Sequence, residues 1–303
     1  MELNQFLFSN NTSIFFHDIG TPFLDILFKV LTNLGSEPVY ILIASLIFWC
    51  YNKKMGIRTM YVIIFSAYVA LLAKNLFGMP RPPEYLHKVT ENEFGFPSGH
   101  TLVSSGFWGY MGFRIRNSRI IIAGAIAVFL VSLSRLYLGV HYPGDVVGGI
   151  VFGLTVAFVF YKGETRVASL FEKQDRITKY LLALFLPTIL VLIASLLGDL
   201  VKEQIELGLV MASIGVGYLL EEEKIRFPDT KNKKHLIKRA LVGIVILGMI
   251  FLVSEILSLT YPVFTYIKYI LLGFSSVFIV PLVFKKLEND DEHRQNLDES
   301  ETN

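Results

Sequence analysis

Residues 119–161 read RIIIAGAIAVFLVSLSRLYLGVHYPGDVVGGIVFGLTVAFVFY, and this stretch decides the fold. Two apolar runs, 119–138 and 144–161, are joined by a short connection that contains His141. A helix of about 20 residues is long enough to cross a hydrocarbon core of ~30 Å. The stretch therefore predicts two membrane-spanning helices with ionisable side chains where they meet.

The remaining sequence has the same character. Of its 303 residues, 53% are apolar and 18% are charged, and the mean hydropathy is +0.52. Soluble chains carry about 25% charged residues. We predict an all-α, polytopic transmembrane helix bundle of about nine spans. The expected spans are 36–51, 56–77, 98–113, 119–138, 144–161, 179–198, 204–220, 239–259 and 263–284.

The distribution of basic residues predicts the orientation. Of the 28 Lys and Arg residues, 21 lie in the connections after the first, third, fifth, seventh and ninth spans. Such connections stay on the cytoplasmic side, because positive loops resist translocation. The N-terminus is therefore expected outside and the C-terminus inside. The net charge of only +2 gives no reason to expect a nucleic-acid partner, and the single cysteine, Cys50, excludes an intrachain disulfide or a Cys-based metal cluster.

Three segments carry ionisable residues on the side that is otherwise poor in positive charge. They read KNLFGMPRP (74–82), PSGH (97–100) and SRLYLGVHYPGD (134–145). Because successive spans alternate in direction, all three segments are expected to meet at one membrane face. Ionisable groups that face a bundle at a helix end are candidates for a functional site.

The residue types in these segments suit a phosphate group. Lys74, Arg81 and Arg135 supply three positive charges, and arginine presents a planar fork of donors to phosphate oxygens. Ser98 and Gly99 lie at an expected helix start, where free N–H groups favour an anion. Each residue alone would be explained better as an interfacial anchor or a helix cap. Their occurrence together favours a phosphate-binding site.

Two histidines add catalytic chemistry. His100 and His141 can act as nucleophile or as acid and base near neutral pH. Asp145 follows His141 by four residues, so its carboxylate can orient the imidazole. A metal site is the weaker alternative, because the ligand types in the outer loop show no tight spacing and three fixed cations would repel a divalent ion. These ligand types are Glu84, His87, Glu91 and Glu93.

The pattern Lys-x6-Arg-Pro, Pro-Ser-Gly-His and Ser-Arg-x5-His-x3-Asp resembles the three-part signature of the type 2 phosphatidic acid phosphatase superfamily. That superfamily includes lipid phosphate phosphatases, bacterial polyprenyl-diphosphate phosphatases and, more distantly, vanadium haloperoxidases. The haloperoxidase branch is typically soluble, unlike this chain. The resemblance covers residues 36–162 and says nothing specific about residues 163–303.

The resemblance implies a role for each matching residue. His141 would attack phosphorus, Asp145 would support His141, and His100 would protonate the leaving oxygen. The remaining matching residues would hold the phosphoryl oxygens while charge develops on them. These are Lys74, Arg81, Ser98, Gly99 and Arg135. No metal or other cofactor is implied.

Four regions are expected along the chain. Residues 1–35 would form an extracytoplasmic segment with an interfacial helix at 12–34, for which a true span is the alternative. Residues 36–162 would form the phosphatase-like core of five spans, 163–284 a further four-span membrane region, and 285–303 a polar cytoplasmic tail. In addition, the loop 83–96 would form the mouth of the site, with Tyr85, His87, Lys88 and Phe94 as candidates for headgroup contact.

The predicted function is that of a multi-pass membrane phosphatase whose site faces the extracytoplasmic or lumenal side, in the plasma membrane if the organism is prokaryotic. Its partners would be the bilayer and a lipid phosphate or diphosphate, such as phosphatidate, phosphatidylglycerophosphate, a sphingoid phosphate or a polyprenyl diphosphate. Two alternatives stay open: a lipid phosphotransferase of the same architecture, and a carrier that binds lipid phosphate without turnover. The oligomeric state is unknown.

Overall fold

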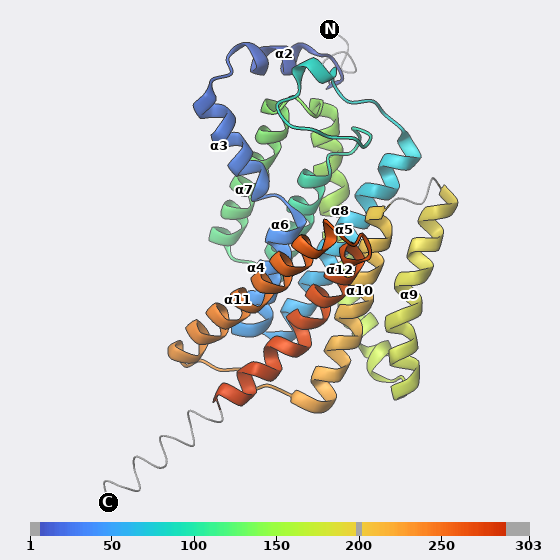
Figure 1. Ribbon diagram of the computed structural model, residues 1–303. Helices are drawn as coiled ribbons and strands as arrows, with labels where there is room; N and C mark the ends of the chain where they lie inside the picture. Colours follow the sequence, from blue (N-terminus) through green and yellow to red (C-terminus); the bar gives the residue numbers. More distant parts are fainter. Residues whose placement is uncertain (1–6, 198–201, 289–303) are drawn as a thin grey trace, which may run out of the picture. The chain divides into compact units, whose positions relative to one another are not determined.

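The computed structural model describes residues 7–197 and 202–288, in which every regular element is a helix (Figure 1). The prediction of an all-α chain is therefore confirmed for these residues. Most of the expected cytoplasmic tail, 289–303, and residues 1–6 lie outside the described part.

Seven of the described helices are long and apolar enough to cross a membrane. They include α5 (Lys53–Phe77), α7 (Ser118–Tyr137) and α8 (Pro143–Glu172). Two of the nine expected spans are shorter. The helix α4 (Glu37–Cys50) has 14 residues and meets the criterion only together with α3 (Pro22–Asn33), to which it is bent by 48°. The helix α6 (Gly99–Ile115) has 17 residues, because Arg116 adopts a left-handed conformation with φ 53° and ends it.

The chain forms two compact units. The described part of the first unit comprises residues 7–41, 58–172 and 194–197, and it contains α2 (Asn11–Asp18), α3, most of α5, the short helix η1 (Glu84–Leu86), α6, α7 and α8. All eight residues predicted for the phosphate site lie in this unit.

Glycines bring α6 and α8 into backbone contact. A Cβ atom on Gly149 would lie 2.8 Å from the carbonyl oxygen of Ser98, and one on Gly153 would meet the carbonyl oxygen of Leu102. The Gly149-x-x-x-Gly153 spacing places both glycines on one face of α8, where their lack of a side chain permits this close packing. Ser98 N also donates to Asp145 O at 3.0 Å. The starts of α6 and α8 are thus held together at Ser98 and Asp145.

The N-terminal segment packs on α7. The expected interfacial helix at 12–34 is two helices, α2 and α3, and Thr21 caps α3 by accepting from Leu24 N. Phe28 of α3 stacks on Tyr137 of α7 with 4.1 Å between the ring centroids. Leu24 and Phe28 join an apolar cluster around Tyr137, Leu138 and Val140. The N-terminal helices are therefore part of the first unit's core.

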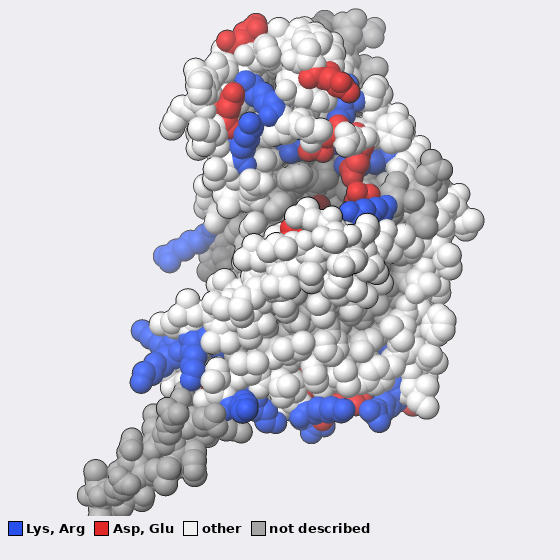
Figure 2. All heavy atoms as spheres, in the orientation of Figure 1, with Lys and Arg blue, Asp and Glu red and all other residues white. Residues whose placement is uncertain are grey.

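The described part of the second unit comprises residues 42–57, 173–193 and 202–288. It contains most of α4, the first residues of α5, most of α9 (Arg176–Leu197), α10 (Lys202–Leu220), η2 (Glu221–Ile225), α11 (Lys233–Ser258), α12 (Val263–Phe274) and η3 (Ser275–Ile279). The indole of Trp49 donates to Ser276 O at 2.7 Å, and Arg239 pairs with Glu288 at 2.8 Å. In this unit, basic side chains gather where α10 ends and α11 begins, as expected for a cytoplasmic loop (Figure 2).

Candidate active site

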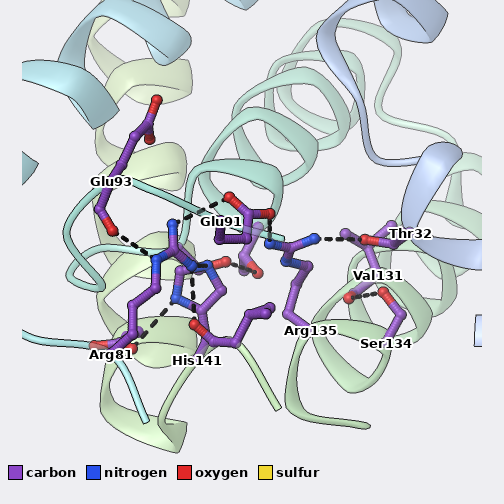
Figure 3. Close-up of polar contacts among 12 residues, drawn as sticks. Thr32, Arg81, Glu91, Glu93, Val131, Ser134, Arg135 and His141 are labelled. Atoms are coloured by element: carbon purple, nitrogen blue, oxygen red, sulfur yellow. Dashed lines mark hydrogen bonds and ion pairs between the residues drawn. The ribbon is translucent and has the colours of Figure 1, made fainter. Parts of the chain in front are cut away.

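The eight predicted site residues meet at one end of the first unit, each from a helix end or a connection. Lys74 lies in the last turn of α5 and Arg135 in the last turn of α7. Arg81 and His141 lie in connections. The other four residues lie at two helix starts: Ser98, Gly99 and His100 open α6, and Asp145 is in the first turn of α8. Figure 3 shows Arg81, Arg135 and His141 of this group with the residues that they contact.

His141 is held between a carboxylate and a guanidinium group. Its Nδ1 lies 3.3 Å from Asp145 Oδ2, and its Nε2 lies 3.1 Å from Arg81 Nη1. Both His141 and Asp145 are buried. Because Pro143 begins α8, Asp145 can also accept from Tyr142 N at 2.8 Å, which fixes the carboxylate. A carboxylate beside Nδ1 favours a proton there, so the lone pair of Nε2 points into the site.

The surroundings keep His141 neutral. Burial, followed by the charges of Arg135, Arg81 and Lys74, lowers the pKa of His141 well below its ordinary value. An unprotonated imidazole is the form that can attack phosphorus. The same cations that suit a phosphate group therefore also keep the candidate nucleophile reactive.

Arg81 is fixed by four contacts. Besides facing His141, its Nη1 donates to Val140 O at 2.9 Å, and its Nε donates to Glu93 O at 2.6 Å. Its Nη2 donates to Glu91 Oε2 at 3.2 Å. Its planar fork is thus oriented beside the nucleophile, where a lysine could not reproduce the pattern.

Arg135 is buried and held on two sides. Its Nη1 donates to Thr32 Oγ1 at 3.0 Å, and its Nη2 forms an ion pair with Glu91. Figure 3 shows the Glu91 carboxylate between the guanidinium groups of Arg81 and Arg135. Although burial by itself would raise it, the charges of Arg135 and Arg81 hold the pKa of Glu91 below its usual range. Glu91 is therefore an anion on the two arginines.

Lys74 completes the cationic group and lies next to the start of α6. Its ammonium pairs with Glu93, and its Nζ lies 3.7 Å from where a Cβ on Gly99 would be. Because Gly99 has no side chain, the lysine and any anion bound by it can approach the backbone of this helix start. Ser98 Oγ does not cap α6 and instead accepts from Thr101 Oγ1 at 3.1 Å.

His100 is half-buried at the start of α6 and is influenced by the charges of Arg135, Glu91 and Lys74. It therefore belongs to the same electrostatic environment as His141. The structure brings both histidines into the site. The division of labour between them stays a prediction.

Three polar residues of the site were missed by sequence reasoning: Thr32, Glu91 and Glu93. The sequence suggests the two glutamates only as possible metal ligands, whereas in the structure each bonds to a cation of the site. Among the described residues, no three His, Cys, Asp or Glu side chains come together in a way that could hold a metal ion. Nothing in the sequence pattern could have identified Thr32, because its contact with Arg135 joins residues 103 positions apart.

The loop 83–96 is tied to the N-terminal helices. Lys88, expected at the mouth of the site, pairs with Asp25 of α3 at 2.8 Å. The hydroxyl of Tyr137 donates to the same Asp25 oxygen at 2.6 Å. His87, expected there too, bonds to Pro82 O at 2.8 Å, whereas Tyr85 and Phe94 are exposed. Lys88 and His87 thus anchor the loop that carries Glu91 and Glu93.

Comparison with known proteins identifies the family of the chain. The chain matches the PAP2 superfamily over residues 56–169, which contain all eight residues of the candidate site. It matches the PAP2 superfamily phosphatase transmembrane extension over residues 205–292. This range contains α11 and α12 and nearly all of α10.

Individual relatives match over part of their length. The chain is 30% identical to phosphatidylglycerophosphatase B of Bacillus subtilis, with 46% of this chain and 75% of that protein covered. It is 30% identical to an undecaprenyl-diphosphatase of Sulfolobus acidocaldarius, with 43% and 65% covered. It is 29% identical to a probable sphingosine-1-phosphate phosphatase of Dictyostelium discoideum, with 44% and 37% covered.

A crystal structure of a transmembrane PAP2-type phosphatidylglycerolphosphate phosphatase from Bacillus subtilis is similar with a TM-score of 0.47 and 24% identity, covering 52% of this chain and 84% of that chain. The family assignment depends on the sequence matches, which extend over the site and include three quarters of one curated relative. The chain belongs to the PAP2 superfamily and carries the transmembrane extension found in PAP2 phosphatases.

Proposed function

We propose that the protein is a membrane-integral, metal-independent phosphatase that hydrolyses lipid phosphate or diphosphate monoesters through a phosphohistidine. The observation that carries this proposal is the placement of His141, whose Nδ1 faces Asp145 and whose Nε2 faces Arg81. A nucleophile oriented by a carboxylate and flanked by fixed cations is the arrangement that phosphoryl transfer requires.

The reaction has two steps. In the first, the Nε2 lone pair of His141 forms a bond to phosphorus while the bond from phosphorus to the leaving oxygen breaks. His100, which holds a second proton only once the negative charge of the substrate phosphate lies beside it, gives that proton to the leaving oxygen. Asp145 stabilises the positive charge that develops on the imidazole of His141. In the second, water attacks the phosphohistidine, His100 takes a proton from the water, and His141 leaves as neutral imidazole with inorganic phosphate as the product.

Positive groups would stabilise the charge on the phosphoryl oxygens in both steps. Lys74, Arg81 and Arg135 all lie around His141 in the described part of the chain. Arg135 Nε is buried and has no hydrogen-bond partner among the described residues. A buried N–H of a charged group is costly when unpaired, so a phosphoryl oxygen is a suitable acceptor for it.

A lipid substrate is supported by the location of the site and by the names of the relatives. The site lies at the ends of α5 and α7, which are both apolar enough to span a membrane. A headgroup can therefore reach the site while its hydrocarbon chain stays in the bilayer. The relatives are named for sphingosine-1-phosphate, undecaprenyl diphosphate and phosphatidylglycerophosphate. We place the site on the extracytoplasmic side, because the basic loops lie at the other ends of the spans.

The test is phosphate release by the purified protein in detergent with excess EDTA. Phosphatidate, phosphatidylglycerophosphate, a sphingoid phosphate and a polyprenyl diphosphate are offered in parallel. The variants are His141→Ala and, as a matched control, His17→Ala, which changes an exposed histidine of α2 in the same unit. Turnover that persists in EDTA, is lost in H141A and is retained in H17A is the expected result.

Other results would favour the alternatives. Product that appears only when an acceptor lipid is supplied indicates a phosphotransferase. Binding of lipid phosphate that survives in H141A, without turnover by the wild type, indicates a carrier. Loss of turnover in EDTA that is restored by a divalent metal would overturn the metal-independent mechanism.

A further inference from the structure

We propose that Thr32 of α3 is a positioning residue that orients Arg135 for phosphate binding, so that the N-terminal helices form part of the active site. This inference rests on the proposed function and deepens it, because it assigns a role in substrate binding to a segment outside the signature motifs. The range matched by the PAP2 superfamily begins at residue 56, so α3 lies outside it.

The contact between Thr32 and Arg135 is buried. Thr32 is 7% exposed and Arg135 is 2% exposed, and Arg135 Nη1 donates to Thr32 Oγ1 at 3.0 Å. Arg135 Nη2 is held by Glu91, which lies on the other side of the guanidinium group in Figure 3. Two fixed terminal nitrogens determine the plane of a guanidinium group. The Nε edge, which has no partner among the described residues, is therefore presented in one orientation.

The sequence of α3 accounts for the position of Thr32. Leu24, Phe28 and Thr32 are spaced by four residues and lie on one face of the helix. Leu24 and Phe28 pack against the apolar cluster around Tyr137 of α7, and Phe28 stacks on Tyr137 itself. One turn beyond Phe28, Thr32 contacts Arg135 of the same helix α7, so the contact of α3 with α7 extends to the guanidinium group.

A second contact ties α3 to the other side of Arg135. Asp25 of α3 pairs with Lys88 at 2.8 Å, and Lys88 is three residues before Glu91. The helix therefore contacts Arg135 directly through Thr32 and anchors the loop that carries the second partner of Arg135. A phosphate-binding arginine that is supported at both terminal nitrogens loses less side-chain freedom when the substrate binds.

The opposite face of α3 is apolar and exposed. Phe23, Ile26 and Val30 are 73%, 66% and 55% exposed. In a membrane protein this face suits the bilayer, where it keeps α3 against α7. The same short helix thus has a lipid-facing side and a side that contacts Arg135.

The experiment compares three single substitutions with the wild type. Thr32→Val removes the acceptor and keeps the shape of the side chain, whereas Thr32→Ser keeps the hydroxyl. Thr155→Val is the matched control, because Thr155 is an exposed threonine of α8 whose hydroxyl donates only within its own helix, to Val151 O. The readouts are KM and kcat for phosphate release, and the affinity for inorganic vanadate measured by calorimetry.

We expect T32V to raise KM and the vanadate Kd together by about tenfold, because the lost acceptor leaves an N–H of a buried charged group unpaired. The value of kcat should change less, T32S should stay within about threefold of the wild type, and T155V should match it. A residue that only supported the fold would lower the amount of active protein, and with it kcat, without changing KM or the vanadate Kd.

The inference is overturned if T32V binds vanadate as tightly as the wild type, or if T32S is as impaired as T32V. Should T32V fail to fold, Thr32→Ala is measured in its place, with the same expectation. The vanadate measurement does not need turnover, so it separates this inference from the proposed function. A wild type that hydrolyses none of the lipids but binds vanadate through Thr32 would contradict the phosphatase activity alone.

Discussion

Replacing Asp145 by asparagine would isolate the electrostatic support of His141. Only Asp145 Oδ2 contacts His141 Nδ1 and Tyr142 N, at 3.3 Å and 2.8 Å. The other oxygen, Oδ1, is buried without a partner among the described residues. In D145N the amide oxygen can take the position of Oδ2 and keep both contacts. The substitution therefore removes the negative charge with little change in geometry.

The magnitude follows from Coulomb's law. At the observed 3.3 Å and an effective dielectric constant of ~20, unit charges on His141 and Asp145 attract each other by about 5 kcal/mol. This attraction exists only once the imidazole becomes positive, as it does when Nε2 bonds to phosphorus. Because each ~1.4 kcal/mol is a factor of ten in rate, and because the charge is only partly developed in the transition state, we expect kcat to fall about 10³-fold.

The assay is the initial rate of phosphate release with the preferred lipid in detergent. KM should change little, since the phosphate-binding cations are untouched, and D145N should still bind vanadate. Asp18→Asn, which alters an exposed aspartate of α2, is the matched control and should behave as the wild type. A kcat for D145N within about tenfold of the wild type would refute the assigned role of the carboxylate.

Three further predictions concern the neighbouring groups. Arg81→Lys should lower kcat/KM by about 10²-fold, because a lysine cannot contact Val140 O, Glu93 O and Glu91 at once. A loss of less than about threefold in initial-rate assays would contradict this prediction. The lowered pKa of His141 keeps the nucleophile neutral as the pH falls through about 6.5, so the acidic midpoint of kcat/KM, measured between about pH 4 and pH 8, should lie below about 6.5. A midpoint at or above about 6.5 would count against His141 as the attacking group. Gly153→Ala should lower the free energy of unfolding by about 1–3 kcal/mol, since its Cβ would meet the backbone of α6. Gly163→Ala is the control and should not lower it, because nothing lies within 4 Å of the added Cβ. Equal melting temperatures of the two variants in detergent would show that α6 and α8 can move apart at no cost.

The long apolar runs predicted the membrane helices well. Spans such as 56–77 and 119–138 correspond closely to α5 and α7, because a mainly apolar run of this length has few alternatives to a helix in a bilayer. The length of α6 was harder to predict, since its end depends on the left-handed backbone of Arg116. The expected span at 144–161 is part of a longer helix, α8, which continues to Glu172 through a stretch too polar to be recognised by hydropathy.

The candidate site likewise has residues that the sequence predicts and residues that it does not. Residues on helix ends, such as Lys74 and Asp145, could be brought together from the order of the spans alone. Thr32, Glu91 and Glu93 could not, because they reach the cations through an irregular loop and through the packing of α3 on α7. Hydropathy and local spacing contain no information on contacts of that kind.

The pairing of Glu91 and Glu93 with the cations has a consequence for selectivity. Three cations, Lys74, Arg81 and Arg135, are in contact with or near three carboxylates, those of Glu91, Glu93 and Asp145. The charges of the site's own residues therefore nearly cancel, so the site would exert little long-range attraction on free phosphate in the surrounding water. A headgroup tethered in the bilayer needs no such attraction, because confinement to two dimensions gives it a high effective concentration at the site. Product inhibition by inorganic phosphate should accordingly be weak, so that the released ion leaves while the next lipid arrives by lateral diffusion.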